Sequence, residues 1–92
     1  MTGTVTDNVA KNRYELPTED GVAVAYYEPR RDAVAFTHTM VPDAMQGRGL
    51  ASTLIKAALA DVRRRGLKIV PECPFVAAYI ERHPEERDLV AD

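Results

Sequence analysis

The stretch "VPDAMQGRGLAS", residues 41–52, decides how this chain folds, because it joins a strand-like segment to a helix-like one. Before it, the run "AVAFTHTMV", residues 33–41, is rich in β-branched and aromatic side chains and predicts a central strand. After it, apolar residues recur at helical spacing from Leu50 and predict a helix that ends near Gly66 in a left-handed cap. The two glycines in between predict a strand-to-helix turn with much exposed backbone.

The alternation in this strand predicts which side chains share a face of the sheet. One face is predicted to carry Val34, Phe36, His38 and Met40, and the residues between them belong to the other face. Pro42 ends the strand, because proline lacks the N–H that a sheet needs.

The remaining elements follow from turn residues and chain length. Residues 9–28 predict a β-hairpin, since two strand-like segments flank the turn sequence "PTEDG". "LKIVP", residues 67–71, predicts a short strand parallel to residues 33–41, because a helical crossover joins the two. A final helix is predicted from Pro74 to near Pro84. The predicted class is α/β (α+β), in the order ββ-β-α-β-α.

Both chain ends are predicted to be solvated. Residues 1–8 are polar and threonine-rich and are expected to be disordered, which leaves residues 9–92 as a single domain. The last residues, 85–92, are expected to form a polar tail in which Leu89 and Val90 could dock.

Composition narrows the classes of function. The chain of 92 residues is 46% hydrophobic and carries a net charge of −2, so nothing in its overall charge favours nucleic acid or anionic lipid. A single cysteine excludes an intramolecular disulfide framework and a cysteine-rich zinc site. The N-terminus lacks the apolar segment of a signal peptide, and no apolar run is long enough to span a bilayer. A cytoplasmic protein is expected.

The glycine segment predicts an anion site, because backbone N–H groups and the positive end of the helix dipole meet there. It is not a Walker A loop, since no Lys follows the second glycine. A dinucleotide fingerprint would read Gly47, Gly49 and then Ser52, so it lacks its third glycine. A plain strand-to-helix turn is the simpler alternative.

The phrase "QGRGLA", Gln46–Ala51, resembles the Q/R-x-x-G-x-G/A pyrophosphate loop of the GNAT acetyltransferases. "HTMVPDAMQGRGLAS" followed by "GLKIVPECPFVAAYIERHPE" is similar to the reduced GNAT family, whose members lack the N-terminal substrate-binding helices of larger enzymes. The resemblance covers residues 9–90 and implies a minimal GNAT fold, in which two parallel strands splay apart.

By this resemblance the ligand is acetyl-coenzyme A, and no metal is implied. Its pantetheine arm would pair with strand backbone between residues 34–41 and 67–71, and its pyrophosphate would meet the glycine loop. The residues that would contact it are Met40, Val41, Gln46, Gly47, Arg48, Gly49, Leu50 and Ala51.

Three side chains are candidates for the chemistry of acetyl transfer. Tyr79 occupies the place where larger GNAT enzymes carry a general acid toward the coenzyme sulfur, although a packing role is the alternative. Cys73 precedes a helix N-terminus, which favours a thiolate that could accept an acyl group, but buried cysteines are often core filler. His38 is a candidate base. The family typically has glutamate where this chain has Met40, so base function shifts to His38, Glu72 or a water molecule.

The predicted function is transfer of an acetyl group from acetyl-coenzyme A to an unidentified amine. Without the N-terminal helices, the acceptor is expected to be large, such as a protein amine, or to be bound with the help of a second copy in a homodimer. The alternative is a non-catalytic module that binds or senses acyl-coenzyme A. Arg63–Arg65 are expected to be a solvated helix end and not a nucleic-acid patch.

Overall fold

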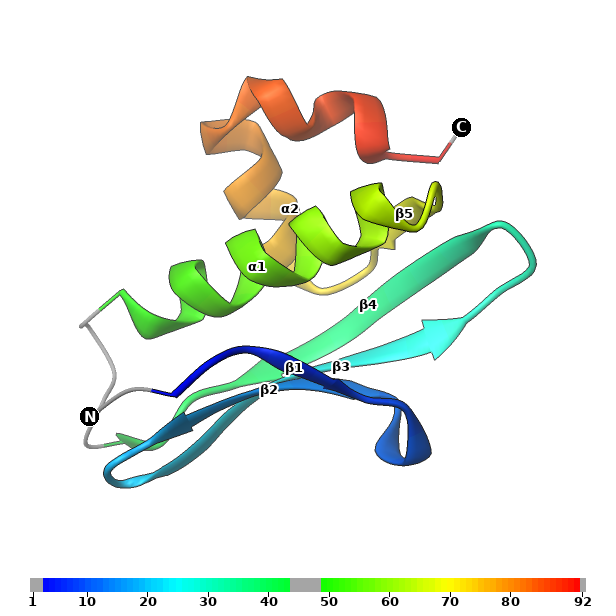
Figure 1. Cartoon of the computed structure of the whole chain (residues 1–92). Helices are drawn as coiled ribbons and strands as arrows, with labels where there is room; N and C mark the ends of the chain where they lie inside the picture. The colour runs from blue at the N-terminus through cyan, green and yellow to red at the C-terminus, as the bar shows by residue number, and fades with distance from the viewer. Residues whose placement is uncertain (1–2, 44–48, 92) are drawn as a thin grey trace.

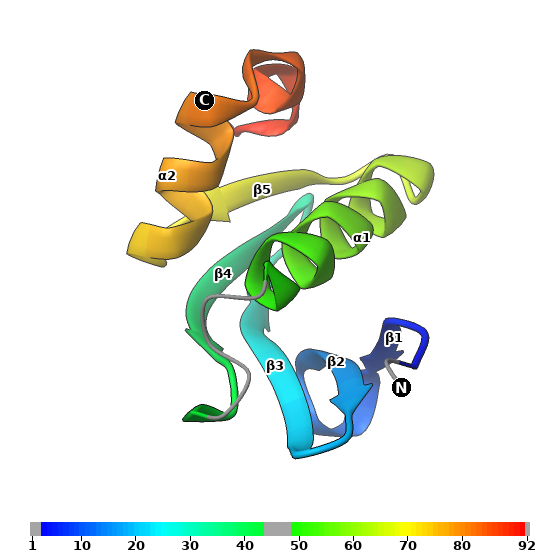
Figure 2. The same ribbon diagram turned by 90° about the vertical axis from the view of Figure 1, so that its left-hand side faces the viewer.

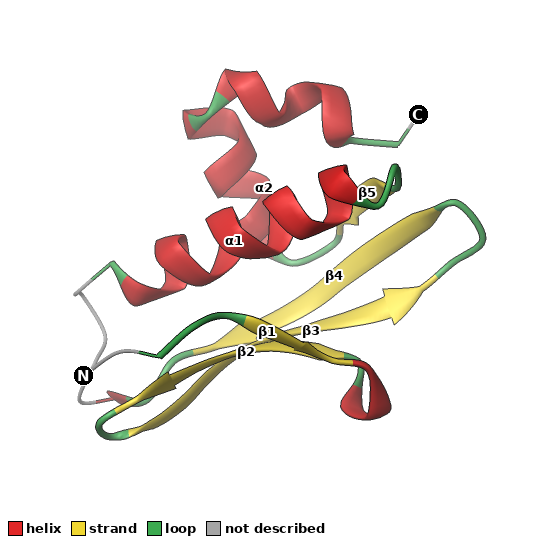
Figure 3. Ribbon diagram, in the orientation of Figure 1, coloured by secondary structure: helices red, strands yellow, loops and turns green. Residues whose placement is uncertain are grey.

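The computed structural model describes residues 3–43 and 49–91. One five-stranded sheet curves around a long helix, and two shorter helical segments complete the chain (Figures 1 and 3). The elements are β1 (Thr6–Asn8), η1 (Val9–Lys11), β2 (Arg13–Thr18), β3 (Gly21–Pro29), β4 (Ala33–Met40), α1 (Leu50–Arg64), β5 (Lys68–Pro71), α2 (Pro74–Arg82) and η3 (Pro84–Leu89).

The strands lie in chain order, β1-β2-β3-β4-β5. The first four pair antiparallel, and β5 pairs parallel to β4 after the crossover through α1. This arrangement confirms the predicted central strand, long helix and parallel strand. The predicted hairpin is formed by β2 and β3, but Val9–Lys11 of its predicted first strand form the 3-10 helix η1. Gly66 has φ +74°, as a left-handed cap requires.

The core lies between α1 and the sheet, because α1 is apolar along one stripe and polar elsewhere. Tyr14 and Leu16 of β2 face this stripe, as does Phe36 of β4, which is 1% exposed. The buried side chains of α1 are Leu54, Ile55, Ala58, Leu59 and Val62.

The chain ends differ from the prediction. Residues 1–8 were predicted to be disordered, but Thr6–Asn8 form β1 and pair with β2. The polar tail is the 3-10 helix η3, and the dockings expected of Leu89 and Val90 occur: Leu89 is buried and Val90 bridges Ile69. Ion pairs that hydropathy does not reveal hold these segments.

A β-bulge corrects the predicted faces of the central strand. Tyr26 pairs with His38 but Tyr27 pairs with Phe36, so Thr37 is the extra residue on β4. One inserted residue exchanges the two faces of everything that follows it. Val34 and Phe36 therefore face the core, whereas His38 and Met40 face the opposite side of the sheet.

The two parallel strands separate at this bulge. Their pairing runs from Ala33 with Lys68 to Phe36 with Pro71, and the N–H of Cys73 then donates to the carbonyl of Phe36 over 2.8 Å. Figure 2 shows β5 turning away from the last part of β4. The predicted splay is present in the sheet.

Candidate functional site

The last part of β4 offers an open strand edge. His38–Met40 pair with β3 on one side, and the register with β5 stops at Phe36. In an antiparallel pair alternate residues direct N–H and C=O groups away from the partner strand. An extended group could add to this edge as a strand does. Met40 and Val41, two predicted contacts of the cofactor, lie at its end.

The first turn of α1 faces the same end of β4. Gly49 is its N-cap at φ +74°, and its carbonyl accepts bonds from the N–H and the hydroxyl of Thr53 at 3.0 and 3.1 Å. Among the described residues, no side chain caps this helix start and no acid lies in its first turn. The backbone N–H groups at the start of a helix favour an anion.

Gly49 is needed here for its backbone conformation. A Cβ built on it meets nothing within 4 Å among the described residues, so close packing does not require glycine at this position. The positive φ does. The predicted contacts Gln46, Gly47 and Arg48 lie outside the described residues.

Cys73 lies on the core side of the splay. Its side chain is 4% exposed, and its Sγ is 3.4 Å from the hydroxyl oxygen of Thr39. Its position as the N-cap of α2 was predicted from Pro74. Cys73 therefore contacts the open part of β4 through Thr39, which the sequence did not indicate.

Tyr79 lies on the next turns of α2 and is 6% exposed. Its ring stacks on His83 with centroids 3.9 Å apart, and His83 Nδ1 is 2.8 Å from the Tyr79 carbonyl oxygen. Burial raises the pKa of the Tyr79 phenol, with a further increase from the charges of Glu86 and Glu85. The phenol thus keeps its proton at neutral pH, as a proton donor must.

His38 lies on the other face of the sheet from Cys73 and Tyr79. It is exposed, and its ring stacks on Tyr26 at 6.4 Å. Arg13 lies over the same tyrosine ring and donates to its hydroxyl over 3.1 Å. The structure therefore brings two predicted catalytic residues to the core side and separates the third from them.

The other candidate base is engaged elsewhere. Glu72 accepts a 2.9 Å bond from Arg30 Nη2, so its carboxylate is held at the outer end of the β3–β4 turn. Met40 is 53% exposed. No carboxylate occupies the position where the family typically has one.

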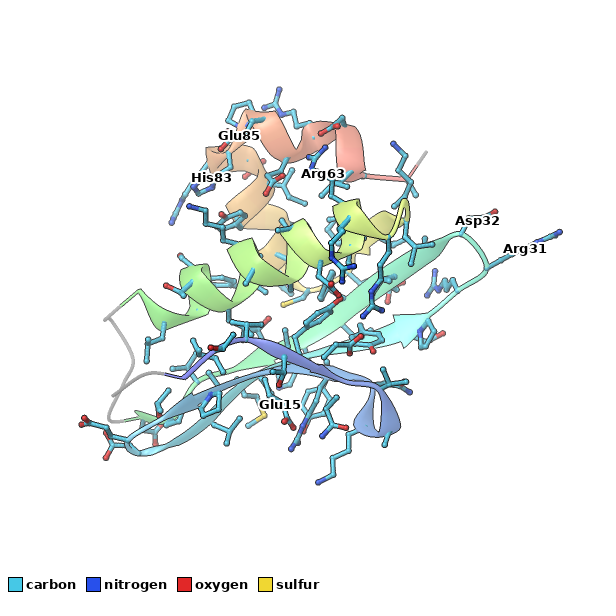
Figure 4. The ribbon with its side chains drawn as sticks, in the orientation of Figure 1. Glu15, Arg31, Asp32, Arg63, His83 and Glu85 are labelled. Carbon is cyan, nitrogen blue, oxygen red and sulfur yellow. The ribbon has the colours of Figure 1, made fainter. Side chains whose placement is uncertain are left out.

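The basic turn at the end of α1 is neutralised within the molecule. Arg63 donates to both carboxylate oxygens of Asp88 at 2.7 and 2.9 Å, which ties η3 to α1 (Figure 4). Arg64 pairs with Asp61, and Arg65 lies 3.0 Å from Asp7 and 3.1 Å from Asp61. These arginines form ion pairs while their side chains stay 41–71% exposed, so the predicted solvated helix end is confirmed.

Sequence reasoning missed two residues next to the candidate side chains. Thr39 contacts Cys73, and Tyr26 supports His38. Both contacts depend on the bulge at Thr37, and a run of alternating strand residues carries no signal for an inserted one.

The fold is that of a small acetyltransferase. A GCN5-like protein from Staphylococcus aureus, solved by NMR in solution, superposes with a TM-score of 0.74 at 22% identity, covering 96% of this chain and 87% of that one. The family model described as GCN5-related N-acetyl-transferase matches residues 13–89. The chain therefore belongs to the GCN5-related N-acetyltransferase family.

The chain is also similar to curated proteins. Human protein NATD1 is 37% identical over 65 residues, which are 71% of this chain and 58% of that protein. The Xenopus tropicalis protein NATD1 is 35% identical over the same length, with 71% and 60% covered. The chain spans about three fifths of the length of these relatives.

The described residues hold neither a cluster of metal-ligand side chains nor a membrane-spanning helix. Within residues 3–43 and 49–91, no three His, Cys, Asp or Glu side chains lie together as a metal site would need. No helix in these ranges is long and apolar enough to cross a membrane.

Proposed function

We propose that this domain transfers an acetyl group from acetyl-coenzyme A to an amine. The observation that carries the proposal is the separation of β4 and β5 after Phe36, together with the start of α1, which lies toward the far end of β4 (Figure 1). An open strand edge suits the amide-bearing pantetheine arm, and the helix start suits a pyrophosphate. The two features occur together and in the order in which the coenzyme carries these groups.

Different groups of this chain would assist different parts of the acetyl transfer. Backbone N–H groups near Met40 and Val41 would hold the acetyl oxygen as it gains negative charge. The amine nitrogen forms a bond to the acetyl carbon, the carbon–sulfur bond breaks, and the amine proton leaves to His38 or to water. Tyr79 donates its proton to the departing thiolate. The raised pKa of the Tyr79 phenol keeps it protonated at neutral pH until then.

Cys73 offers a second route through an acyl intermediate. The thiolate would first take the acetyl group and release coenzyme A, and the amine would then release the cysteine. The contact with Thr39 lies on the open part of β4, which favours access of the thiol to that edge. A burst of thiol release without any amine would distinguish this route from direct attack.

A module that binds acyl-coenzyme A without turnover is the second candidate. Met40 favours it, because a half-exposed thioether cannot remove a proton from an amine. Thiol release that depends on added amine would exclude this candidate.

Calorimetric titration of acetyl-coenzyme A tests the proposal. Two glycines at opposite ends of α1 make a matched pair, since Gly49 and Gly66 both have φ +74° and open space at the Cβ position. Gly49→Glu and Gly66→Glu impose similar backbone strain, but only the first places a carboxylate at the helix start. We expect wild type and Gly66→Glu to bind and Gly49→Glu to lose most of the affinity. Equal loss in both variants, or no heat with wild type, contradicts the proposal.

A further inference from the structure

The outer face of the sheet, away from α1, carries a groove at the end of β4. Its volume is about 410 Å³, within the range of small-molecule sites. The strands β2, β3 and β4 and the residues directly after β4 form its walls. The groove is lined by Arg13, Val22, Val24, Tyr26, Met40, Val41, Pro42 and Asp43.

The bulge creates this groove. By exchanging the faces of β4 after Thr37, it places Met40 on the outer side, in register with Val24. Met40 is 53% exposed and Val22 is 46% exposed, so two large apolar side chains that line the groove face solvent. Apolar surface gathered in a concave site favours a ligand that has an apolar part.

The polar residues of the groove lie at its ends. At one end, the guanidinium of Arg13 donates hydrogen bonds to Glu15 and to the hydroxyl of Tyr26. Figure 4 shows Glu15 on this outer side of the sheet. At the other end, Asp43 supplies the one carboxylate among the described lining residues. A carboxylate in the same groove as the apolar side chains of Val22, Val24 and Met40 suits a ligand that has both a cationic nitrogen and an apolar part.

The groove and the open strand edge share residues. Met40 and Val41 line the groove and also end the part of β4 where the acetyl group would be presented. His38 lies on the groove side, next to Tyr26. A nucleophile bound in the groove would therefore lie beside both the reacting carbon and the candidate base.

We propose that this groove binds the acceptor, and that the acceptor is a small primary amine whose nitrogen is attached to an apolar body. The inference rests on the proposed function and narrows its substrate class. Val22, Val24 and Met40 contact the apolar body, and the nitrogen lies at the end of the groove formed by Val41 and Asp43. Acetyl transfer forms the carbon–nitrogen bond, breaks the carbon–sulfur bond and passes the amine proton to His38 or to water.

Methyl NMR of the full chain tests the groove without requiring turnover. The probes are 2-phenylethylamine and ethanolamine, two primary amines of which only the first has an apolar body. We expect 2-phenylethylamine to shift the methyl signals of Val22, Val24 and Met40 at concentrations at which ethanolamine leaves them unchanged. Equal shifts from both amines, or none from either, overturn the inference.

A pair of valine variants adds a matched control. Val22 and Val9 are both exposed, at 46% and 65%, but only Val22 lines the groove. We expect Val22→Ser to weaken 2-phenylethylamine binding about tenfold, since two methyl groups are lost, and Val9→Ser to leave it unchanged. Equal affinities in both variants overturn the assignment of the groove.

The acetyl-coenzyme A titration separates this inference from the proposed function. Binding of acetyl-coenzyme A without shifts from the amine overturns the groove and leaves the proposed function intact. Shifts from the apolar amine without binding of acetyl-coenzyme A support the chemistry of the groove and overturn the proposed function.

Discussion

The two halves of β4 share an alternating sequence pattern but differ in their strand pairing and in their burial. Ala33–Phe36 pair with β3 and β5, and Phe36 lies deep in the core. In Thr37–Met40, the last three residues pair with β3, none is in the β5 register, and Met40 is half exposed. The comparison shows how one strand can hold the fold together with its first half and present backbone to a ligand with its second, and that one inserted residue separates the two tasks.

The largest expected effect is a loss of stability caused by a substitution in the first half of β4. Phe36→Ala should lower the free energy of unfolding by about 3–5 kcal/mol, because it leaves a cavity among Tyr14 and Tyr27. Met40→Ala, on the other half, should change it by about 0.5 kcal/mol or less, since the side chain is half exposed. Urea denaturation measures both. Similar losses in the two variants would show that the halves are not distinct.

Removal of the Tyr79 hydroxyl should affect chemistry and not the fold. Tyr79→Phe keeps the ring that stacks on His83. We expect kcat to fall about a hundredfold while the KM for acetyl-coenzyme A stays the same, as loss of a general acid predicts. Steady-state kinetics with a thiol reagent measures this. If Cys73→Ala loses more activity than Tyr79→Phe, the acyl intermediate is the better account.

Alkaline pH should loosen the first half of β4 through the tyrosines beneath it. Burial, and then the 2.7 Å bond to Asp61, raise the pKa of Tyr14 above its usual value, and burial and Asp7 do the same for Tyr27. Above about pH 10 the unfolded chain loses these protons while the folded chain keeps them, so stability is full below pH 10 and declines as pH rises.

Tyr14 sets the expected size of this decline. It should contribute a slope of about 1.4 kcal/mol per pH unit above pH 10. Urea denaturation of wild type and Tyr14→Phe at several pH values checks it, and the slope should be shallower in the variant. An unchanged slope would show that Tyr14 titrates alike in the folded and unfolded chains.

The smallest expected effect concerns the outer face of the second half. His38→Gln should lower kcat/KM for an amine about tenfold, because water can replace an exposed base in part. Stability should be unchanged, since the ring is exposed. The dependence of kcat/KM on pH is the more telling measurement: a profile that changes in the variant supports His38 as the base, and an unaltered profile assigns the proton to water.

Much of the fold could be predicted because periodicity carries it. Apolar spacing and turn residues predict the helix from Leu50, a hairpin within residues 9–28 and the parallel strand at residues 67–71. The 3-10 segment η3 could not be predicted in this way, since its docking depends on ion pairs with Arg63 over a separation of 25 residues. Side-chain pairing at that distance leaves no pattern in a single sequence.

The sequence predicts where the candidate residues lie along the chain, but not which face of the sheet their side chains occupy. Tyr79 lies on the final helix and Cys73 directly before it, as predicted, and both side chains belong to the core. His38 and Met40 were expected to share a face with Phe36, and the bulge at Thr37 reverses this. A bulge is set by the match between two strands and by twist, so it depends on residues far apart in the chain.

Backbone amide NMR during titration with acetyl-coenzyme A tests the central claim most directly, because both halves of β4 are observed in one experiment. The account predicts shifts at Thr37–Val41 and in the first turn of α1, with Ala33–Phe36 little changed. Shifts confined to the first half of β4, to the surface near β1, or to no part of the chain would contradict it.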